Sequence, residues 1–132
     1  MDFVPFDLAK KLKEKGYPQV EKNTLAMYNE DGDWYSLATT LDDFCYCFHD
    51  FDEHDYVCPT ISQVLKWLRE EKYILIGLSP MQEYDGEENV EWCSTVFKSD
   101  KQGGLSWKEE FYYQSYEQAA LAGIEYVLDK LI

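Results

Sequence analysis

The sequence has few positive charges, and the long stretch between Lys22 and Lys66 contains no lysine or arginine. Twelve basic residues stand against twenty-six acidic ones, which gives a formal net charge of −14 at neutral pH. Binding to nucleic acid or to an anionic membrane needs clustered lysine and arginine side chains. The composition therefore predicts no direct nucleic-acid binding and no membrane binding, and it favours a basic partner protein.

Long apolar runs are also lacking. No window approaches the roughly 18 apolar residues of a membrane span, and the opening residues 1–5 lack the charged and apolar regions of an export signal. Without a signal for an oxidising compartment, we expect a cytoplasmic protein whose cysteines are reduced. These are Cys45, Cys47, Cys58 and Cys93.

Catalytic motifs are absent as well. The chain contains no G-x-S-x-G, G-x-x-x-x-G-K or H-E-x-x-H pattern. A nucleophilic cysteine needs an electropositive environment that lowers its pKa, whereas most of the cysteines lie in an acidic stretch of the sequence. We therefore lean against an enzyme and name no catalytic residue.

What the chain does contain is enough apolar material for one core. Hydrophobic residues make up 45% of its 132 residues and aromatic residues 17%, and two domains of half this length would each have too little core. We expect a single α+β domain that spans residues 1–132.

Three helices are predicted from their end signals and apolar stripes. The first covers 5–15, with a proline at its start and Gly16 as its stop. The second covers 60–72, with Thr60 and Gln63 as a capping box, and the third begins at Ser115, with Gln118 in the equivalent position.

The remaining periodic segments predict strands. Residues 25–28 and 34–37 flank an Asp-Gly turn and form a hairpin, and further strands are expected at 44–48, 73–78, 92–98 and 105–113. The predicted fold is an antiparallel sheet of about four to six strands with three helices, mainly on one face. The oligomeric state is left open, since 105–113 is a candidate edge strand.

The helix signals of 59–71, the strand after them and the final 115–120 segment resemble a set of small uncharacterised proteins from phages and mobile elements of gut Bacteroides and relatives. The likeness spans most of the chain, including the opening segment 3–9, and it consists of caps and core stripes. It implies a cytoplasmic, single-domain accessory protein. It brings no functional residues, because that family has no assigned activity.

One segment offers soft and borderline ligands for a metal. Its thiols and imidazoles suit Zn²⁺, but a Cys-x-Cys pair on a strand puts its sulfurs roughly 6 to 7 Å apart, which is wide for shared tetrahedral binding. A zinc site and a set of small buried thiols with a solvated histidine both remain open, and no other cofactor is expected. The candidate ligands are Cys45, Cys47, His49, His54 and Cys58.

The same part of the chain is rich in carboxylates, which leads to our first functional hypothesis: a non-enzymatic protein-binding module that uses an acidic surface. Such a surface can stand in for phosphates and occupy the basic groove of a host or phage protein. The alternative is a small metal- or ligand-binding domain centred on residues 45–58. The acidic surface is predicted from Asp42, Asp43, Asp50, Asp52, Glu53 and Asp55.

Aromatic residues are the other candidates for recognition, because tyrosine and tryptophan dominate protein interfaces. Most of them must belong to the core of so small a domain. We expect partial exposure at Trp67, Tyr112, Tyr113 and Tyr116.

Overall fold

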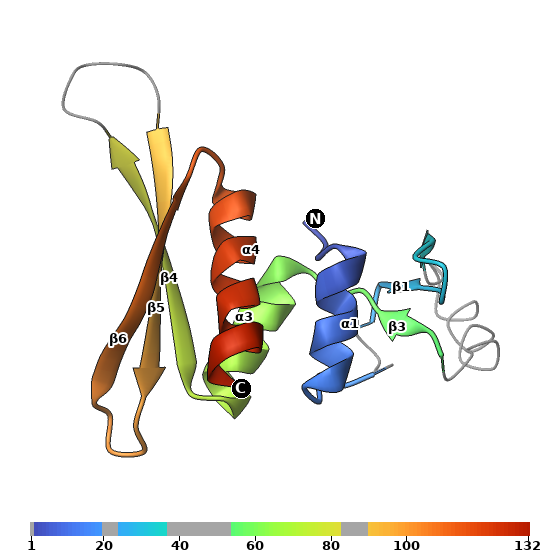
Figure 1. Cartoon of the computed structure of the whole chain (residues 1–132), viewed down its shortest axis with the longest axis horizontal. Helices are drawn as coiled ribbons and strands as arrows, with labels where there is room; N and C mark the ends of the chain where they lie inside the picture. Colours follow the sequence, from blue (N-terminus) through green and yellow to red (C-terminus); the bar gives the residue numbers. More distant parts are fainter. Residues whose placement is uncertain (1, 20–23, 37–53, 83–89) are drawn as a thin grey trace. The chain divides into compact units, whose positions relative to one another are not determined.

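The structure, a computed structural model, describes residues 2–19, 24–36, 54–82 and 90–132. These residues contain three α-helices and six strands in two antiparallel sheets, which confirms the α+β class (Figure 1). They divide into two compact units: an N-terminal unit within 3–60, and a C-terminal unit of 61–132 together with Asp2. Each unit is described by itself, and the single-domain organisation stays a prediction.

The N-terminal unit combines one helix with a small sheet of strand order β2-β1-β3. Strand β1 is central and pairs antiparallel with both neighbours, so that Met27 lies opposite Tyr35 on one side and Val57 on the other. Met27 and Val57 are buried and form the centre of this small core. The elements are α1 (Phe6–Glu14), β1 (Ala26–Tyr28), β2 (Trp34–Ser36) and β3 (Tyr56–Val57).

The turn between β1 and β2 confirms the hairpin predicted from the Asp-Gly pair. The side chain of Asn29 accepts hydrogen bonds from the backbone N–H groups of Asp31 and Asp33, at 3.0 and 2.9 Å. Gly32 has a φ of 88°, a left-handed conformation that side chains disfavour. A Cβ atom at Gly32 would also lie 3.0 Å from Cδ1 of Phe6, so this position excludes a side chain for two reasons.

We predict that Gly32→Ala lowers the free energy of unfolding by about 1 to 2 kcal/mol, because it adds backbone strain and crowds the Phe6 ring. Gly16→Ala is the matched control, since Gly16 has a φ of 91° but nothing within 4 Å of its Cβ position. Urea denaturation of both variants measures the difference. An equal loss in the two would show that the Phe6 contact costs nothing.

The C-terminal unit is built on a longer antiparallel sheet in which sequential strands are neighbours. It consists of β4 (Ile74–Gln82), β5 (Val90–Ser99) and β6 (Leu105–Tyr113), in the order β4-β5-β6. Strands β5 and β6 are out of regular register between Val96 and Phe97: Val96 faces Glu109, but Phe97 faces Trp107. Lys108 is thus the extra residue of a β-bulge.

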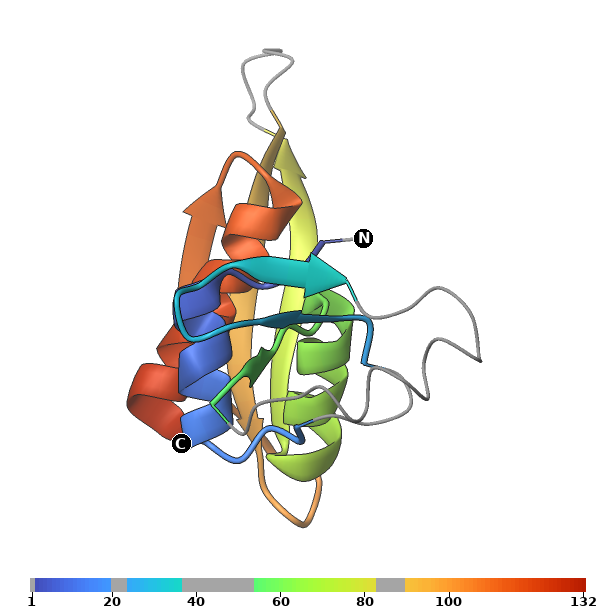
Figure 2. The same cartoon turned by 90° about the vertical axis from the view of Figure 1, so that its right-hand side faces the viewer.

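Helices α3 (Ile61–Glu71) and α4 (Tyr116–Tyr126), which continues into a short π-helix η1 (Val127–Leu131), lie on the same side of this sheet (Figures 1 and 2). The apolar stripes of both helices are buried, and so are Ile74, Ser94 and Val96 of the strands below them. Ser115 caps α4 as predicted, because its Oγ accepts the N–H of Gln118 at 3.1 Å. The buried core includes Val64, Leu68, Ile74, Val96, Ile124 and Leu128.

Helix α4 approaches the sheet closely at Gly123. A Cβ atom there would lie 3.1 Å from Cγ2 of Ile76 and 3.3 Å from Oγ of Ser94. Ser94 is fully buried, and its hydroxyl has no hydrogen-bond partner. The small side chain at 94 thus serves the close packing, whereas its hydroxyl makes no contact that stabilises the fold.

We predict that Ser94→Ala raises the free energy of unfolding by about 1 kcal/mol, because the variant no longer buries an unsatisfied hydroxyl. Ser99→Ala is the control, since Oγ of Ser99 donates to the carbonyl of Asp100 at 3.0 Å near the surface. Thermal and urea denaturation compare the two variants with the native chain. A clear loss of stability in Ser94→Ala would contradict this account.

The strands are divided between two sheets of three, whereas we expected them in one sheet. The strand predicted at 44–48 lies outside the described residues. Strand β3 was not expected, because two residues are too short to show a period-2 pattern. The proline at the start of the first helix occupies the N-cap position, one residue before the helix begins at Phe6.

Candidate functional site

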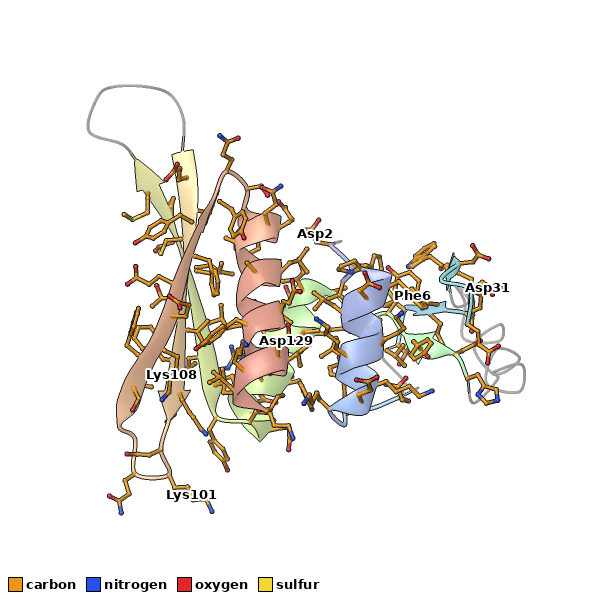
Figure 3. The ribbon with its side chains drawn as sticks, in the orientation of Figure 1. Asp2, Phe6, Asp31, Lys101, Lys108 and Asp129 are labelled. Carbon is orange, nitrogen blue, oxygen red and sulfur yellow. The ribbon has the colours of Figure 1, made fainter. Side chains whose placement is uncertain are left out.

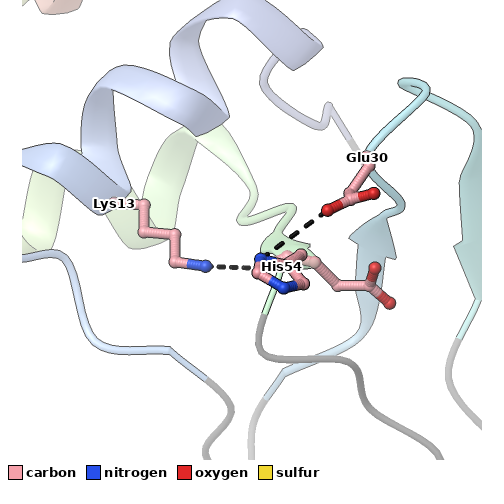
Figure 4. A network of polar contacts seen from close by, with 4 residues as sticks. Lys13, Glu30 and His54 are labelled. Atoms are coloured by element: carbon pink, nitrogen blue, oxygen red, sulfur yellow. Dashed lines mark hydrogen bonds and ion pairs between the residues drawn. The ribbon is translucent and has the colours of Figure 1, made fainter.

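The predicted metal ligands are only partly described. Cys45, Cys47 and His49 lie outside the described residues, whereas His54 and Cys58 lie in the N-terminal unit. The side chain of His54 is 59% exposed, and its Nδ1 is 3.6 Å from Oε1 of Glu30 (Figure 4). Cys58 is fully buried instead. The two side chains therefore occupy different environments.

Cys58 is part of the packing of the N-terminal unit. The carbonyl of Val4 accepts hydrogen bonds from Sγ of Cys58 at 3.6 Å and from the hydroxyl of Tyr28 at 2.8 Å. Burial raises the pKa values of the Cys58 thiol and of Tyr28, since it penalises their charged forms. Among the described residues, no three His, Cys, Asp or Glu side chains are grouped so that they could hold a metal ion. The zinc site stays a prediction from the sequence.

We predict that Cys58 is not alkylated by iodoacetamide at neutral pH while the protein is folded, because the thiol is buried and its raised pKa leaves little thiolate. Mass-spectrometric mapping of the labelled peptide, with and without urea, measures this. Labelling should appear only over the urea range in which the N-terminal unit unfolds. Rapid labelling without urea would contradict the prediction.

Only one residue of the predicted acidic surface is described. Asp42, Asp43, Asp50, Asp52 and Glu53 lie outside the described residues. The carboxylate of Asp55 accepts a hydrogen bond from the hydroxyl of Tyr35 at 2.5 Å, and its backbone carbonyl accepts one from Nζ of Lys13 at 3.0 Å. Asp55 therefore contributes to the internal hydrogen bonding of the N-terminal unit.

A different surface stands out in the C-terminal unit: the face of its sheet opposite α3 and α4, which we call the open face. Figure 3 shows side chains on this side of the sheet, away from α4. Met81, Leu105, Trp107 and Tyr112 are between 45% and 57% exposed. The larger apolar or aromatic residues of the open face are Leu75, Met81, Phe97, Leu105, Trp107 and Tyr112.

The strand register assigns these residues to one face. Residues directly opposite each other in an antiparallel pair point to the same side. Leu75, Phe97 and Trp107 form one row across the three strands, and Gly77, Thr95 and Glu110 form the next. The third row joins Ser79, Cys93 and Tyr112.

The centre of the open face along β6 is a carboxylate held by two aromatic side chains. The indole Nε1–H of Trp107 donates to Oε1 of Glu110 at 3.2 Å, and the hydroxyl of Tyr112 donates to Oε2 at 2.5 Å. The hydrogen bond to the Glu110 carboxylate raises the pKa of Tyr112 to about 12, because it stabilises the protonated phenol. We call these three residues the Glu110 cluster.

The β-bulge at Lys108 creates this cluster. In a regular strand, Trp107 and Glu110 would point to opposite faces, because they are three residues apart. The extra residue in β6 shifts the alternation, so that Trp107 lies on the same face as Glu110 and Tyr112. Bulges commonly re-aim a side chain in this way near functional sites.

The charge of the open face is negative. Of the residues that the strand register assigns to it, Glu91 and Glu110 are acidic, and none is a lysine or arginine; Lys108, the bulge residue, has no partner in this register. Lys98 faces Ile74 in the row that the helices cover, and Lys101 lies in the loop at the end of the β5–β6 hairpin (Figure 3). The register rows of the open face thus combine apolar and aromatic side chains with carboxylates and contain no basic side chain.

Sequence reasoning found one residue of this site, Tyr112, which is exposed as expected, at 51%. Tyr113 is also exposed as expected, at 41%, but it lies opposite Trp92, in a row of the other face. The expected exposure of Trp67 was wrong, because only 8% of this residue is exposed, and Nζ of Lys72 lies 5.3 Å from the centroid of its ring. Tyr116 is half-buried against Trp92, with ring centroids 5.2 Å apart.

Trp107 and Glu110 were not singled out from the sequence. The polar and aromatic composition of 105–113 predicted an edge strand, but no sequence pattern marks the bulge that brings Trp107 and Glu110 to one face. No helix among the described residues is long and apolar enough to cross a membrane. Comparison with protein-family models, curated proteins and solved structures finds no match. The phage or mobile-element origin therefore rests on the resemblance alone and stays a prediction.

Proposed function

We propose that this chain is a non-enzymatic protein-binding module of the cytoplasm, and that it binds a basic partner protein through the open face of the C-terminal sheet. The observation that carries this proposal is an exposed aromatic face whose register rows contain two carboxylates, Glu91 and Glu110, and no lysine or arginine. This refines the acidic-surface hypothesis, since the contact area is aromatic and the acidic groups set the sign of its partner.

The exposed area supports a macromolecular partner. Four large apolar or aromatic side chains of one face are each about half exposed, and three of them, Leu105, Trp107 and Tyr112, lie on the same strand. Contiguous exposed apolar patches mark interaction sites, whereas scattered single residues are ordinary. Tyrosine and tryptophan supply much of the binding energy in such contacts. A sheet face of nine- and ten-residue strands offers a broad surface for this purpose.

The charge of the chain supports a basic partner. At a net charge of −14, an approaching protein of positive charge is attracted and an acidic one is repelled. The carboxylates of the 42–55 segment contribute to this net charge and so to the association rate with a basic partner.

We predict that random peptides selected for binding to the immobilised protein are enriched in lysine or arginine together with aromatic or aliphatic residues. Counter-selection against a Leu105→Ser, Trp107→Ser double variant restricts the result to the open face. The binding of the selected peptides should weaken as salt rises, because attraction between exposed charges is screened.

The control for this selection is Trp34→Ser, which removes a 48% exposed tryptophan from the N-terminal unit. Selected peptides should bind this variant as they bind the native chain. Peptides without excess positive charge, or peptides that bind the double variant equally well, would overturn the proposed function.

A further inference from the structure

We infer that the Glu110 cluster is a subsite for the guanidinium group of an arginine side chain of the partner. This inference rests on the proposed function and names the chemical group that the open face recognises at its charged centre. It follows from the remaining hydrogen-bonding capacity of Glu110, from the aromatic residues beside it and from the small residues in its row.

The carboxylate of Glu110 retains acceptor capacity on both oxygens. An ionised carboxylate has about four lone-pair sites, and the bonds from Trp107 and Tyr112 use one on each oxygen. These two bonds also fix the carboxylate, so that less side-chain entropy is lost when a ligand binds. A guanidinium group donates two parallel N–H bonds, which match the two oxygens of one carboxylate.

The aromatic neighbours favour arginine over lysine. A guanidinium group is planar and weakly hydrated, and it stacks on indole and phenol rings while it bonds to a carboxylate. Trp107 and Tyr112 flank Glu110 on the same face and are 55% and 51% exposed. An ammonium group lacks both the planar surface and the paired donors.

The row that contains Glu110 leaves space for the rest of an arginine side chain. Thr95 lies next to Glu110 in this row, and Gly77 lies next to Thr95. Gly77 has no side chain, and the nearest atom to the position that a Cβ would take is the backbone oxygen of Thr95, 4.0 Å away. The adjacent row of Leu75, Phe97 and Trp107 is apolar. The methylene groups of arginine can lie along this row while the guanidinium group meets Glu110.

The test uses three eight-residue peptides in which serine alternates with arginine, lysine or citrulline. Citrulline has the shape of arginine without its charge. We expect the arginine peptide to bind the native chain at least about threefold more tightly than the lysine peptide, and the citrulline peptide to bind most weakly. Isothermal titration at low salt measures the affinities, and the indole N–H resonance of Trp107 should shift on binding.

The decisive variant is Glu110→Gln, which keeps the size of the side chain and removes its charge. We expect it to weaken binding of the arginine peptide about fivefold or more. Glu70→Gln is the matched control, because Glu70 is an exposed carboxylate of α3, and its loss should change binding less than twofold. Trp107→Leu keeps the charge of Glu110 and should also weaken binding, at least about threefold.

The outcomes separate this inference from the proposed function. Equal effects of Glu110→Gln and Glu70→Gln, or equal binding of the arginine and citrulline peptides, would overturn the arginine subsite. Citrulline binding would indicate recognition of a neutral ligand instead. Neither result alters the peptide selection, which depends on the whole open face and tests the proposed function independently.

Discussion

The close packing of α4 on the sheet at Gly123 determines the organisation of the C-terminal unit. Because position 123 has no side chain, the helix backbone approaches Ile76 and Ser94 directly. Helix α3 buries its stripe on the same side, so both helices serve one face of three strands. The unit thereby gains a dense core on one side and has no helix left for the other. An exposed open face follows from this one-sided arrangement.

The bulge in β6 then decides what the open face carries. With regular alternation, the tryptophan would point toward the helices and the carboxylate would have one aromatic neighbour fewer. The shift at Lys108 puts an indole donor and a phenol donor on the two oxygens of one carboxylate. A local irregularity of the backbone thus produces a preorganised anionic group, which is a property of the register rather than of any single residue.

Local signals in the sequence predicted the elements well. The Ser115 cap, the stop at Gly16 and the Asp-Gly turn act through neighbouring residues, and all three were located correctly. The grouping of strands into two sheets depends on contacts between distant segments, which no local pattern encodes. The exposure of Trp67 was predicted wrongly because this residue lies beside the apolar stripe of its helix. The helix also buries residues beside the stripe, including Trp67. The Glu110 cluster was missed because regular alternation along the strand would put Trp107 and Glu110 on opposite faces, and the bulge puts them on the same face.

Charge explains how an acidic protein can keep an aromatic face exposed. Two copies that met through their open faces would bring Glu91 and Glu110 of each into one interface without a lysine or arginine of either open face to pair with them. Repulsion between two chains of −14 would add to the cost of desolvating these carboxylates. A basic partner reverses both effects, since it supplies the missing cations and is attracted from a distance. The same carboxylates thus oppose self-association and favour a cationic ligand. The acidity of the chain and the aromatic residues of its open face together select a basic partner over a second copy of the chain.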